Sequence, residues 1–197
     1  YGETYSYGAG SHRLTQVAAG GGTRVMGYDA AGALVTDEKN GTTYVYIHDG
    51  AGRLVEARNG TVGFATYAYD AFEQRVSKTT TAAAPGGASN MHFIHDQDGR
   101  LIAEHDGATG AVLREYVWLG LLPVAYVDHS SGTPALYYVL ADQVGEPQKL
   151  TNAGGAVVWD RVATPWRQEI SVSGSLTQPL IFPGQRVIPP EIRLVEK

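Results

Sequence analysis

The chain has 197 residues, no cysteine and a formal net charge of −5 at pH 7. This length fits one domain, and the lack of cysteine excludes disulfide frameworks, thiolate catalysis and cysteine-ligated metals. The acidic balance without a basic stripe argues against a nucleic-acid partner. The chain has no run of about 18 apolar residues, so the sequence predicts no membrane span.

The composition favours strands and turns. The chain contains 25 glycines and 12 tyrosines, while charged residues make up 18%. β-branched residues are spread evenly, and no apolar period of 3.6 residues lasts beyond two turns. We therefore expect an all-β fold.

A short unit recurs along the chain. The clearest copies are Tyr28–Leu34, His48–Leu54 and His95–Leu101, with a looser copy at Tyr69–Val76 and a degraded one at Tyr7–Leu14. The opening aromatic residue or histidine therefore recurs in steps of 21, 20, 21 and 26 residues. A period of this length indicates a repeat protein, in which each unit must stack on its neighbours to bury its apolar face.

Each unit predicts a tight turn between two strands. An Asp at the first position accepts backbone N–H bonds, and a Gly at the fourth supplies a positive φ. Asn40-Gly41 and Asn59-Gly60 lie between these turns and are the strongest short hairpin signal. The structural turn residues predicted are Tyr28, Asp29, Gly32, His48, Asp49, Gly52, Tyr69, Asp70, His95, Asp96 and Gly99.

The two kinds of turn alternate about every ten residues, which predicts consecutive antiparallel β-hairpins in one curved, spiralling sheet. The segment 82–89 is an insertion that accounts for the long step, and we expect no domain boundary there. From residue 112 onward the frame loosens but the segments stay rich in β formers. We expect one β domain over 1–185 and a divergent tail over 186–197, because the prolines from Pro183 onward should take the chain out of the sheet.

The repeated Tyr-Asp-x-x-Gly-Arg-Leu unit resembles the YD-repeat, or Rhs, family, also known from the teneurin-like shell. The segment Tyr137–Pro147, followed by Val157–Trp159 and Phe182–Gln185, is similar to the core segment of that family. The resemblance implies a hollow shell of β-hairpins that encloses a C-terminal toxin in bacterial members and serves adhesion in animal members. The chain departs from the family after Gln185, where the expected further units and self-cleavage landmark are missing.

The residues offer little for catalysis. His-Asp pairs at 48–49, 95–96 and 105–106 could supply metal ligands, but two of them occupy the turn position of the repeat. Serine and histidine are scattered, with no Gly-x-Ser-x-Gly elbow. We therefore predict no enzyme, and no catalytic, cofactor-binding or metal residue.

Tyrosines and tryptophans on the predicted strands have two interpretations. They can form a ladder of cross-strand pairs that joins neighbouring hairpins. Alternatively, exposed rings at Tyr44, Tyr46, Trp118 and Trp159 could form a carbohydrate-binding or adhesion surface.

The sequence thus predicts a non-catalytic shell segment that encapsulates or presents a polypeptide toxin cargo. Its expected partners are that cargo or other shell segments, with self-association through unpaired sheet edges. The resemblance implies a secreted or cell-surface location. The N-terminus shows no signal segment, so the chain is expected in the cytoplasm before export.

Overall fold

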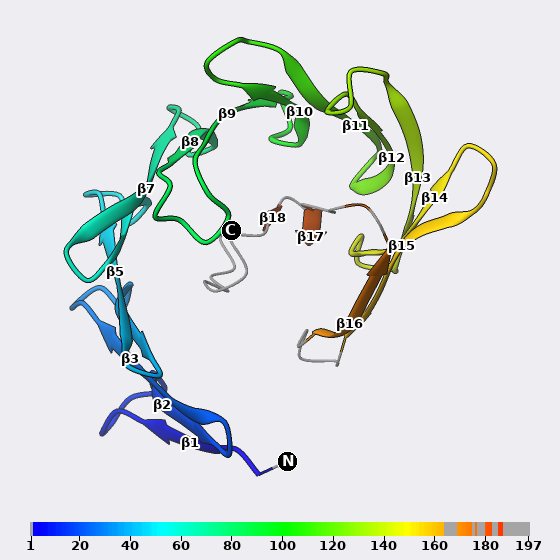
Figure 1. The fold of residues 1–197 in the computed structure, drawn as a ribbon. Coiled ribbons are helices and arrows are strands. Elements are labelled where there is room, and N and C mark those ends of the chain that lie inside the picture. The colour runs from blue at the N-terminus through cyan, green and yellow to red at the C-terminus, as the bar shows by residue number, and fades with distance from the viewer. Residues whose placement is uncertain (1, 164–168, 175, 177–179, 183–184, 187–197) are drawn as a thin grey trace. The chain divides into compact units, whose positions relative to one another are not determined.

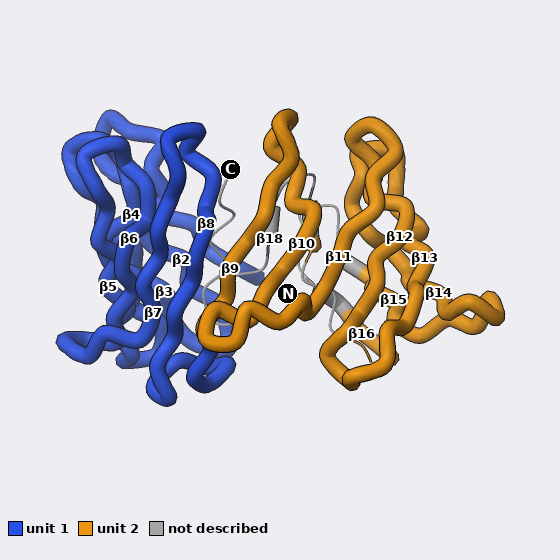
Figure 2. Tube along the Cα trace, turned by 90° about the horizontal axis from the view of Figure 1, so that it is seen from above, with its two compact units in different colours: residues 1–89 blue, residues 90–197 orange. Residues whose placement is uncertain are grey.

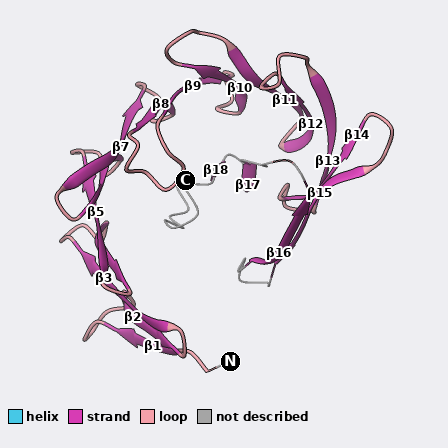
Figure 3. Ribbon diagram, viewed as in Figure 1, coloured by secondary structure: helices cyan, strands magenta, loops and turns pink. Residues whose placement is uncertain are grey.

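The computed structural model describes residues 2–163, 169–174, 176, 180–182 and 185–186. These residues form strands and turns without any helix (Figures 1 and 3). Consecutive strands pair antiparallel, so the predicted all-β fold of successive hairpins is confirmed. No helix among the described residues is long and apolar enough to cross a bilayer.

The chain divides into two compact units, residues 1–89 and 90–197 (Figure 2). The division falls at the end of the 82–89 insertion, within the region expected to be one domain. In the first unit each strand pairs with the next in chain order. Its strands are β1 (Thr4–Tyr7), β2 (Leu14–Ala19), β3 (Gly22–Tyr28), β4 (Leu34–Lys39), β5 (Thr42–His48), β6 (Leu54–Asn59), β7 (Val62–Tyr69) and β8 (Arg75–Thr80).

The second unit continues in the same way, and each strand from β9 to β16 pairs with its successor. These strands are β9 (Ser89–His95), β10 (Leu101–Asp106), β11 (Val112–Leu119), β12 (Leu122–Asp128), β13 (Ala135–Ala141), β14 (Pro147–Asn152), β15 (Val157–Ala163) and β16 (Glu169–Gly174). After them, β17 (Leu180–Phe182) and β18 (Gln185–Arg186) form a separate two-stranded sheet. Among the described residues the main sheet thus ends with β16 at Gly174, and residues 187–197 of the predicted tail lie outside the described residues.

The two Asn-Gly dipeptides adopt different registers. Asn40 and Gly41 both have positive φ, 51° and 80°, and form the two-residue loop of a type I′ hairpin. Asn59, by contrast, is the last residue of β6 and pairs with Val62, so the loop there is Gly60-Thr61. The prediction of Asn59-Gly60 as the loop is therefore wrong by one residue.

A bulge follows this loop on β7. Arg58 pairs with Gly63 but Ala57 pairs with Ala65, which leaves Phe64 as the extra residue on β7. Phe64 and Ala65 are both buried, although they are adjacent in the sequence. The register observed between β6 and β7 thus combines a loop at Gly60-Thr61 with a bulge at Phe64.

One turn carries a residue that its backbone disfavours. Glu73 has φ of 66°, at the position where the other turns of this kind place glycine. We expect Glu73→Gly to raise the free energy of unfolding by about 1 kcal/mol, because glycine adopts this conformation without steric cost. Chemical denaturation followed by circular dichroism measures the change, and Glu38→Gly within β4 is the control that should destabilise. Equal effects of the two variants would contradict the strain argument.

The core of each unit is built mainly from aromatic rings on one face of the sheet. In the first unit, Tyr44, Tyr46, Phe64 and Tyr67 are buried, and the Tyr44 and Phe64 rings meet edge to face at 6.1 Å. In the second unit the buried cluster comprises Phe93, Leu101, Tyr116, Tyr126, Leu150, Trp159 and Leu180. Without these large rings, a single layer of strands would bury little apolar area.

The predicted aromatic ladder is present in the second unit. Tyr116 pairs with Tyr126 across β11 and β12, and Tyr126 pairs with Tyr137 across β12 and β13. The ring centroids lie 6.1 Å and 5.3 Å apart. Three consecutive strands are thereby joined through side chains as well as through the backbone.

Candidate functional site

The repeated Asp residues organise the turns at one end of the hairpins. At the turn between β5 and β6, the Gly52 amide donates to the Asp49 carbonyl at 2.9 Å. The Asp49 amide donates to the Arg53 carbonyl at 2.9 Å, and the Asp49 carboxylate accepts the amides of Ala51 and Arg53 at 2.9 and 3.0 Å. Gly52 has φ of 81°, as this turn requires. The side chain of Asp49 thus satisfies donors that the turn would leave to solvent.

The same turn recurs in both units. Two backbone hydrogen bonds define this turn: the amide of its first residue donates to the carbonyl of the fifth, and the amide of the fourth donates to the carbonyl of the first. Both bonds are present in the turns whose first residue is Asp29, Asp49, Asp70, Asp96, Asp142 or Asn152. The predicted turn residues therefore lie at corresponding places in their hairpins. Asn152 shows that a neutral amide also forms this turn, since its side-chain oxygen accepts the Gly154 and Ala156 amides at 3.0 Å.

An arginine closes two of these turns. The Arg53 Nε donates to Asp49 Oδ2 at 2.8 Å, and the Arg100 Nε donates to Asp96 Oδ2 at 2.7 Å. The side-chain and backbone hydrogen bonds from Arg53 hold the pKa of Asp49 below its usual value. The backbone bond from Arg100, followed by its side-chain bond, does the same for the pKa of Asp96.

These lowered pKa values predict a loss of stability in acid. A carboxyl whose pKa is lower in the folded state stabilises the fold fully above its unfolded pKa, and this stabilisation disappears as the pH falls through the folded pKa. Because the ordinary pKa of an Asp side chain is 3.8, we expect the free energy of unfolding to decrease when the pH falls below about 4. Denaturation at pH 5 and pH 3 measures the effect.

The matched variant for this pH prediction is Asp49→Asn with Asp96→Asn. Asparagine keeps the turn acceptor, as Asn152 does, but has no charge to titrate. The pH dependence should therefore become shallower in the double variant. An unchanged slope would show that other carboxyls govern the acid response.

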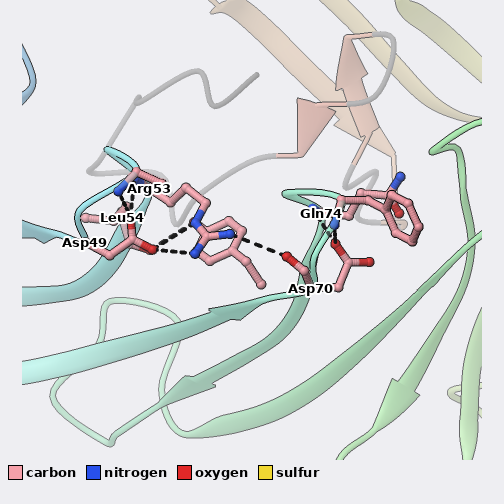
Figure 4. A network of polar contacts seen from close by, with 8 residues as sticks. Asp49, Arg53, Leu54, Asp70 and Gln74 are labelled. Carbon is pink, nitrogen blue, oxygen red and sulfur yellow. Dashed lines mark hydrogen bonds and ion pairs between the residues drawn. The ribbon is translucent and has the colours of Figure 1, made fainter.

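Successive turns are joined by a reciprocal contact that the sequence analysis missed. The Arg53 guanidinium reaches forward and donates to the Asp70 carbonyl of the next Asp turn at 3.4 Å (Figure 4). The Tyr69 hydroxyl reaches back and donates to the Leu54 carbonyl at 2.9 Å. The guanidinium also lies 5.2 Å from the Tyr69 ring centroid, within cation–π range. We call this pair of contacts, Arg forward and aromatic backward, a clamp.

Two further clamps have the same form. In the first unit, Arg13 donates to the Asp29 carbonyl at 3.0 Å, and the Tyr28 hydroxyl donates to the Leu14 carbonyl at 2.8 Å. Gly32 allows this approach, because a Cβ there would lie 3.0 Å from the Arg13 guanidinium.

The third clamp lies in the second unit. Arg100 donates to the Gly120 carbonyl at 2.8 Å, and the Trp118 Nε1 donates to the Leu101 carbonyl at 2.8 Å. Each clamp begins with an Arg-Leu dipeptide, at 13–14, 53–54 and 100–101, and an aromatic residue 14 to 17 positions further on completes it. This combination was the signal in the sequence for these contacts.

One pair of neighbouring repeats in the first unit departs from this pattern. Ala33 stands at the arginine position and His48 at the aromatic position of the following repeat. Ala33 has no donor, and the buried His48 Nδ1 has no hydrogen-bond partner among the described residues. The Arg and the aromatic residue are thus replaced together at this junction.

The His-Asp pairs do not assemble into a metal centre in the described part of the chain, which holds no group of three or more potential ligands. Asp49, Asp96 and Asp106 instead accept backbone amides of their own turns. The backbone bond from Thr109 is the main cause that lowers the pKa of Asp106. The turn interpretation therefore accounts for these aspartates.

The aromatic surface required by the carbohydrate alternative is missing at the predicted rings. Tyr44, Tyr46 and Trp159 are buried, and Trp118 is partly buried with its Nε1 held by the Leu101 carbonyl. Burial in the core removes the ring faces on which a sugar would stack. These residues serve packing between hairpins.

Charged side chains are also buried on the core face. In the first unit, Arg24 binds Asp37 through two hydrogen bonds of 2.7 Å, and Asp37 is buried. In the second unit Glu104 lies among Arg114 and Tyr116, and Glu146 pairs with the buried Arg161. These pairs satisfy charges that burial would otherwise make costly.

The fold and the turns define an all-β repeat protein of stacked hairpins. No protein-family model matches the chain. The double-stranded DNA deaminase toxin A of Burkholderia cenocepacia (strain H111) is 25% identical over 185 residues, covering 80% of this chain and 13% of that protein. The chain thus spans about an eighth of the length of this curated relative.

Similar solved structures are Tc toxin components. A Photorhabdus luminescens Tc holotoxin pore has a TM-score of 0.36 at 10% identity, over 93% of this chain and 15% of the compared chain. A TcdB2–TccC3 complex has a TM-score of 0.32 at 9% identity, over 95% of this chain and 16% of the other.

Proposed function

We propose that the chain is a non-catalytic wall segment of a larger bacterial protein of the Rhs/YD-repeat type, which encloses or presents a polypeptide toxin. The observation that carries this proposal is the clamp, because it joins one turn to the next in a repeating manner. A wall made in this way is extended by adding hairpins, and its function needs no reactive side chain.

The curated relative supports the toxin context. It is named as a toxin, and this chain matches a small part of its length. A segment with a similar sequence inside a much larger toxin protein is consistent with a structural role for that segment. We accordingly propose that the whole protein acts after export, at the cell surface or outside the cell.

The mechanism is physical separation. A continuous layer of hydrogen-bonded strands keeps proteases and water from a polypeptide held on one side of it. The clamps matter for this role because a hairpin that detaches opens the layer at that point. Each clamp contributes two hydrogen bonds, worth about 0.5–1.5 kcal/mol each.

Limited proteolysis of the full-length protein tests the proposal. We expect the toxin region to resist thermolysin in the intact protein, and to be cleaved quickly when residues 1–185 are deleted. The double variant Arg53→Ala/Tyr69→Phe should give an intermediate rate, because it removes one clamp. Tyr138→Phe, at a half-exposed ring, is the matched control and should leave the rate unchanged.

The outcome that contradicts a wall function is equal resistance of the toxin region with and without residues 1–185. Mass spectrometry of the fragments identifies where each cleavage occurs. Circular dichroism of each variant separates loss of protection from loss of fold.

A further inference from the structure

We propose that the first unit opens locally between β4 and β5, where the ends of these two strands separate while the Asn40-Gly41 loop between them stays closed. Ala33 and His48 mark this junction, because they stand where the other two junctions between hairpins of the unit carry the two halves of a clamp. The inference goes beyond the proposed function, since it assigns the wall a place at which it parts.

The three junctions between hairpins in the first unit share one geometry. Each is closed at one end by a short loop, and its backbone ladder stops before the strands reach their Asp turns. The last paired residues are Gln16 with Val25 between β2 and β3, Thr36 with Val45 between β4 and β5, and Glu56 with Thr66 between β6 and β7. Beyond these pairs a clamp continues the contact from strand to strand.

Clamps bridge this stretch at two of the three junctions. The Tyr28 hydroxyl binds the Leu14 carbonyl across β2 and β3, and the second clamp does the same across β6 and β7. Between β4 and β5 the corresponding residues are Leu34 and His48, which are 14 positions apart, as Leu14 and Tyr28 are. The His48 Nδ1 has no hydrogen-bond partner among the described residues. This junction is therefore held by its loop and its ladder, without a clamp.

The turn that would receive the arginine has room for it. In the first clamp the Arg13 guanidinium lies 3.0 Å from the place that a Cβ would take on Gly32. Gly52 is the equivalent glycine of the turn that begins at Asp49, and nothing lies within 4 Å of its Cβ position. The Asp49 carbonyl accepts the Gly52 amide, and a carbonyl oxygen has a second lone pair. The turn can thus bind a guanidinium, which Ala33 does not supply.

The closed junction also leaves two polar atoms of β5 buried. Neither the Tyr46 hydroxyl nor the His48 Nδ1 has a hydrogen-bond partner within the described part of the chain. Both residues lie beyond the last β4–β5 pair, at the end where the clamp is missing. A buried polar atom without a partner costs free energy, and water can satisfy it once the strands separate. Opening is therefore easier for two reasons, the absent clamp bonds and the hydration of these atoms.

The hairpins on either side of the junction keep their own contacts. Arg24 binds Asp37 between β3 and β4 through two hydrogen bonds of 2.7 Å, and Arg53 closes the turn between β5 and β6 by its bond to Asp49. Separation therefore takes place between the two hairpins and leaves each of them intact. In a wall of stacked hairpins, a gap would begin at this junction.

Hydrogen exchange of the full chain, read by NMR under native conditions, tests the inference. The amides that bond across the β4–β5 ladder report opening of this junction, and those across the β6–β7 ladder report the clamped junction next to it. We expect exchange across β4–β5 to be about tenfold faster, because the two hydrogen bonds of a clamp together correspond to at least about this factor.

Ala33→Arg combined with His48→Tyr should close the junction. The two changes supply both halves of a clamp at the spacing of the first one, and should slow exchange across β4–β5 about tenfold. Ala33→Met combined with His48→Phe is the matched control. It fills similar space without a donor, and should slow the same exchange by less than about threefold.

Arg13→Ala combined with Tyr28→His makes the reverse change. It gives the β2–β3 junction the residues of the open one, so exchange across β2–β3 should become about tenfold faster. Exchange across β6–β7 should stay the same. A general loss of stability would instead speed exchange at both junctions.

Equal exchange across β4–β5 and β6–β7 in the unchanged chain would overturn the inference. Equal effects of the closing variant and its matched control would overturn it as well, once circular dichroism shows that both are folded. If the closing variant does not fold, the reverse change decides between the same two outcomes. These measurements involve no toxin region, so they can fail while the protease test of the wall function succeeds.

Discussion

Tyr126→Ala is expected to lower the free energy of unfolding by about 3–5 kcal/mol. Tyr126 is 0% exposed and stands between Tyr116 and Tyr137 in the ladder of the second unit. Removing its ring leaves a cavity and breaks two ring contacts at once. Urea denaturation followed by circular dichroism and by tryptophan fluorescence measures the loss, since Trp159 belongs to the same cluster.

Two variants define what the ring contributes. The Tyr126 hydroxyl is buried without a hydrogen-bond partner among the described residues, so Tyr126→Phe should leave stability unchanged or raise it. Burial also raises the pKa of this phenol, which therefore stays protonated at ordinary pH. Tyr138→Ala, at a 48% exposed ring on the other face of β13, should cost much less than Tyr126→Ala. Equal losses at Tyr126 and Tyr138 would contradict the assignment of the core face.

Glu104→Ala is expected to lower the free energy of unfolding by about 3 kcal/mol. The Glu104 side chain is 0% exposed, accepts the Tyr116 hydroxyl at 2.8 Å and binds Arg114 at 3.2 Å. Its removal leaves a partly buried guanidinium and a buried hydroxyl without the acceptor that Glu104 provides, and breaking a buried pair typically costs 3–5 kcal/mol. The lower end applies because Asp128 stays 3.5 Å from the Arg114 Nε.

Glu115→Ala is the matched control for the buried pair. Glu115 lies next to Arg114 on β11 but on the solvent side, where it pairs with His129 at 2.8 Å. An exposed pair of this kind is worth about 1 kcal/mol or less. Denaturation of both variants under identical conditions gives the comparison. If Glu104→Ala proves as mild as Glu115→Ala, water reaches the Glu104 site in solution.

The sequence predicted the turns because their chemistry is local. Asp49 and Gly52 lie three residues apart, and the bonds that form their turn stay within five residues. The all-β class was predicted from the alternation of apolar and polar residues along the strands and from the repeated unit. Asn59-Gly60 shows the limit of such reasoning, since the pairing of β6 with β7 places the loop one residue later, at Gly60-Thr61.

The aromatic residues illustrate the same limit. Tyr44 and Tyr46 are two residues apart on one strand, so the sequence pattern alone places them on the same face of the sheet. Whether that face is core or surface is decided by the neighbouring strands. The rings are buried, so the carbohydrate surface that depended on their exposure is lost.

The sequence by itself determined the period, the Asp-x-x-Gly turns and the all-β class, because each depends on residues that are near neighbours along the chain. Only the tertiary structure decided that Arg53 reaches Asp70, that Tyr69 reaches Leu54 and that Glu104 is buried beside Arg114. Those contacts join residues 10 to 17 positions apart, and they exist only once strand register has brought successive turns side by side. The repeated unit specifies each hairpin, and the packing of one hairpin on the next specifies the contacts between successive turns.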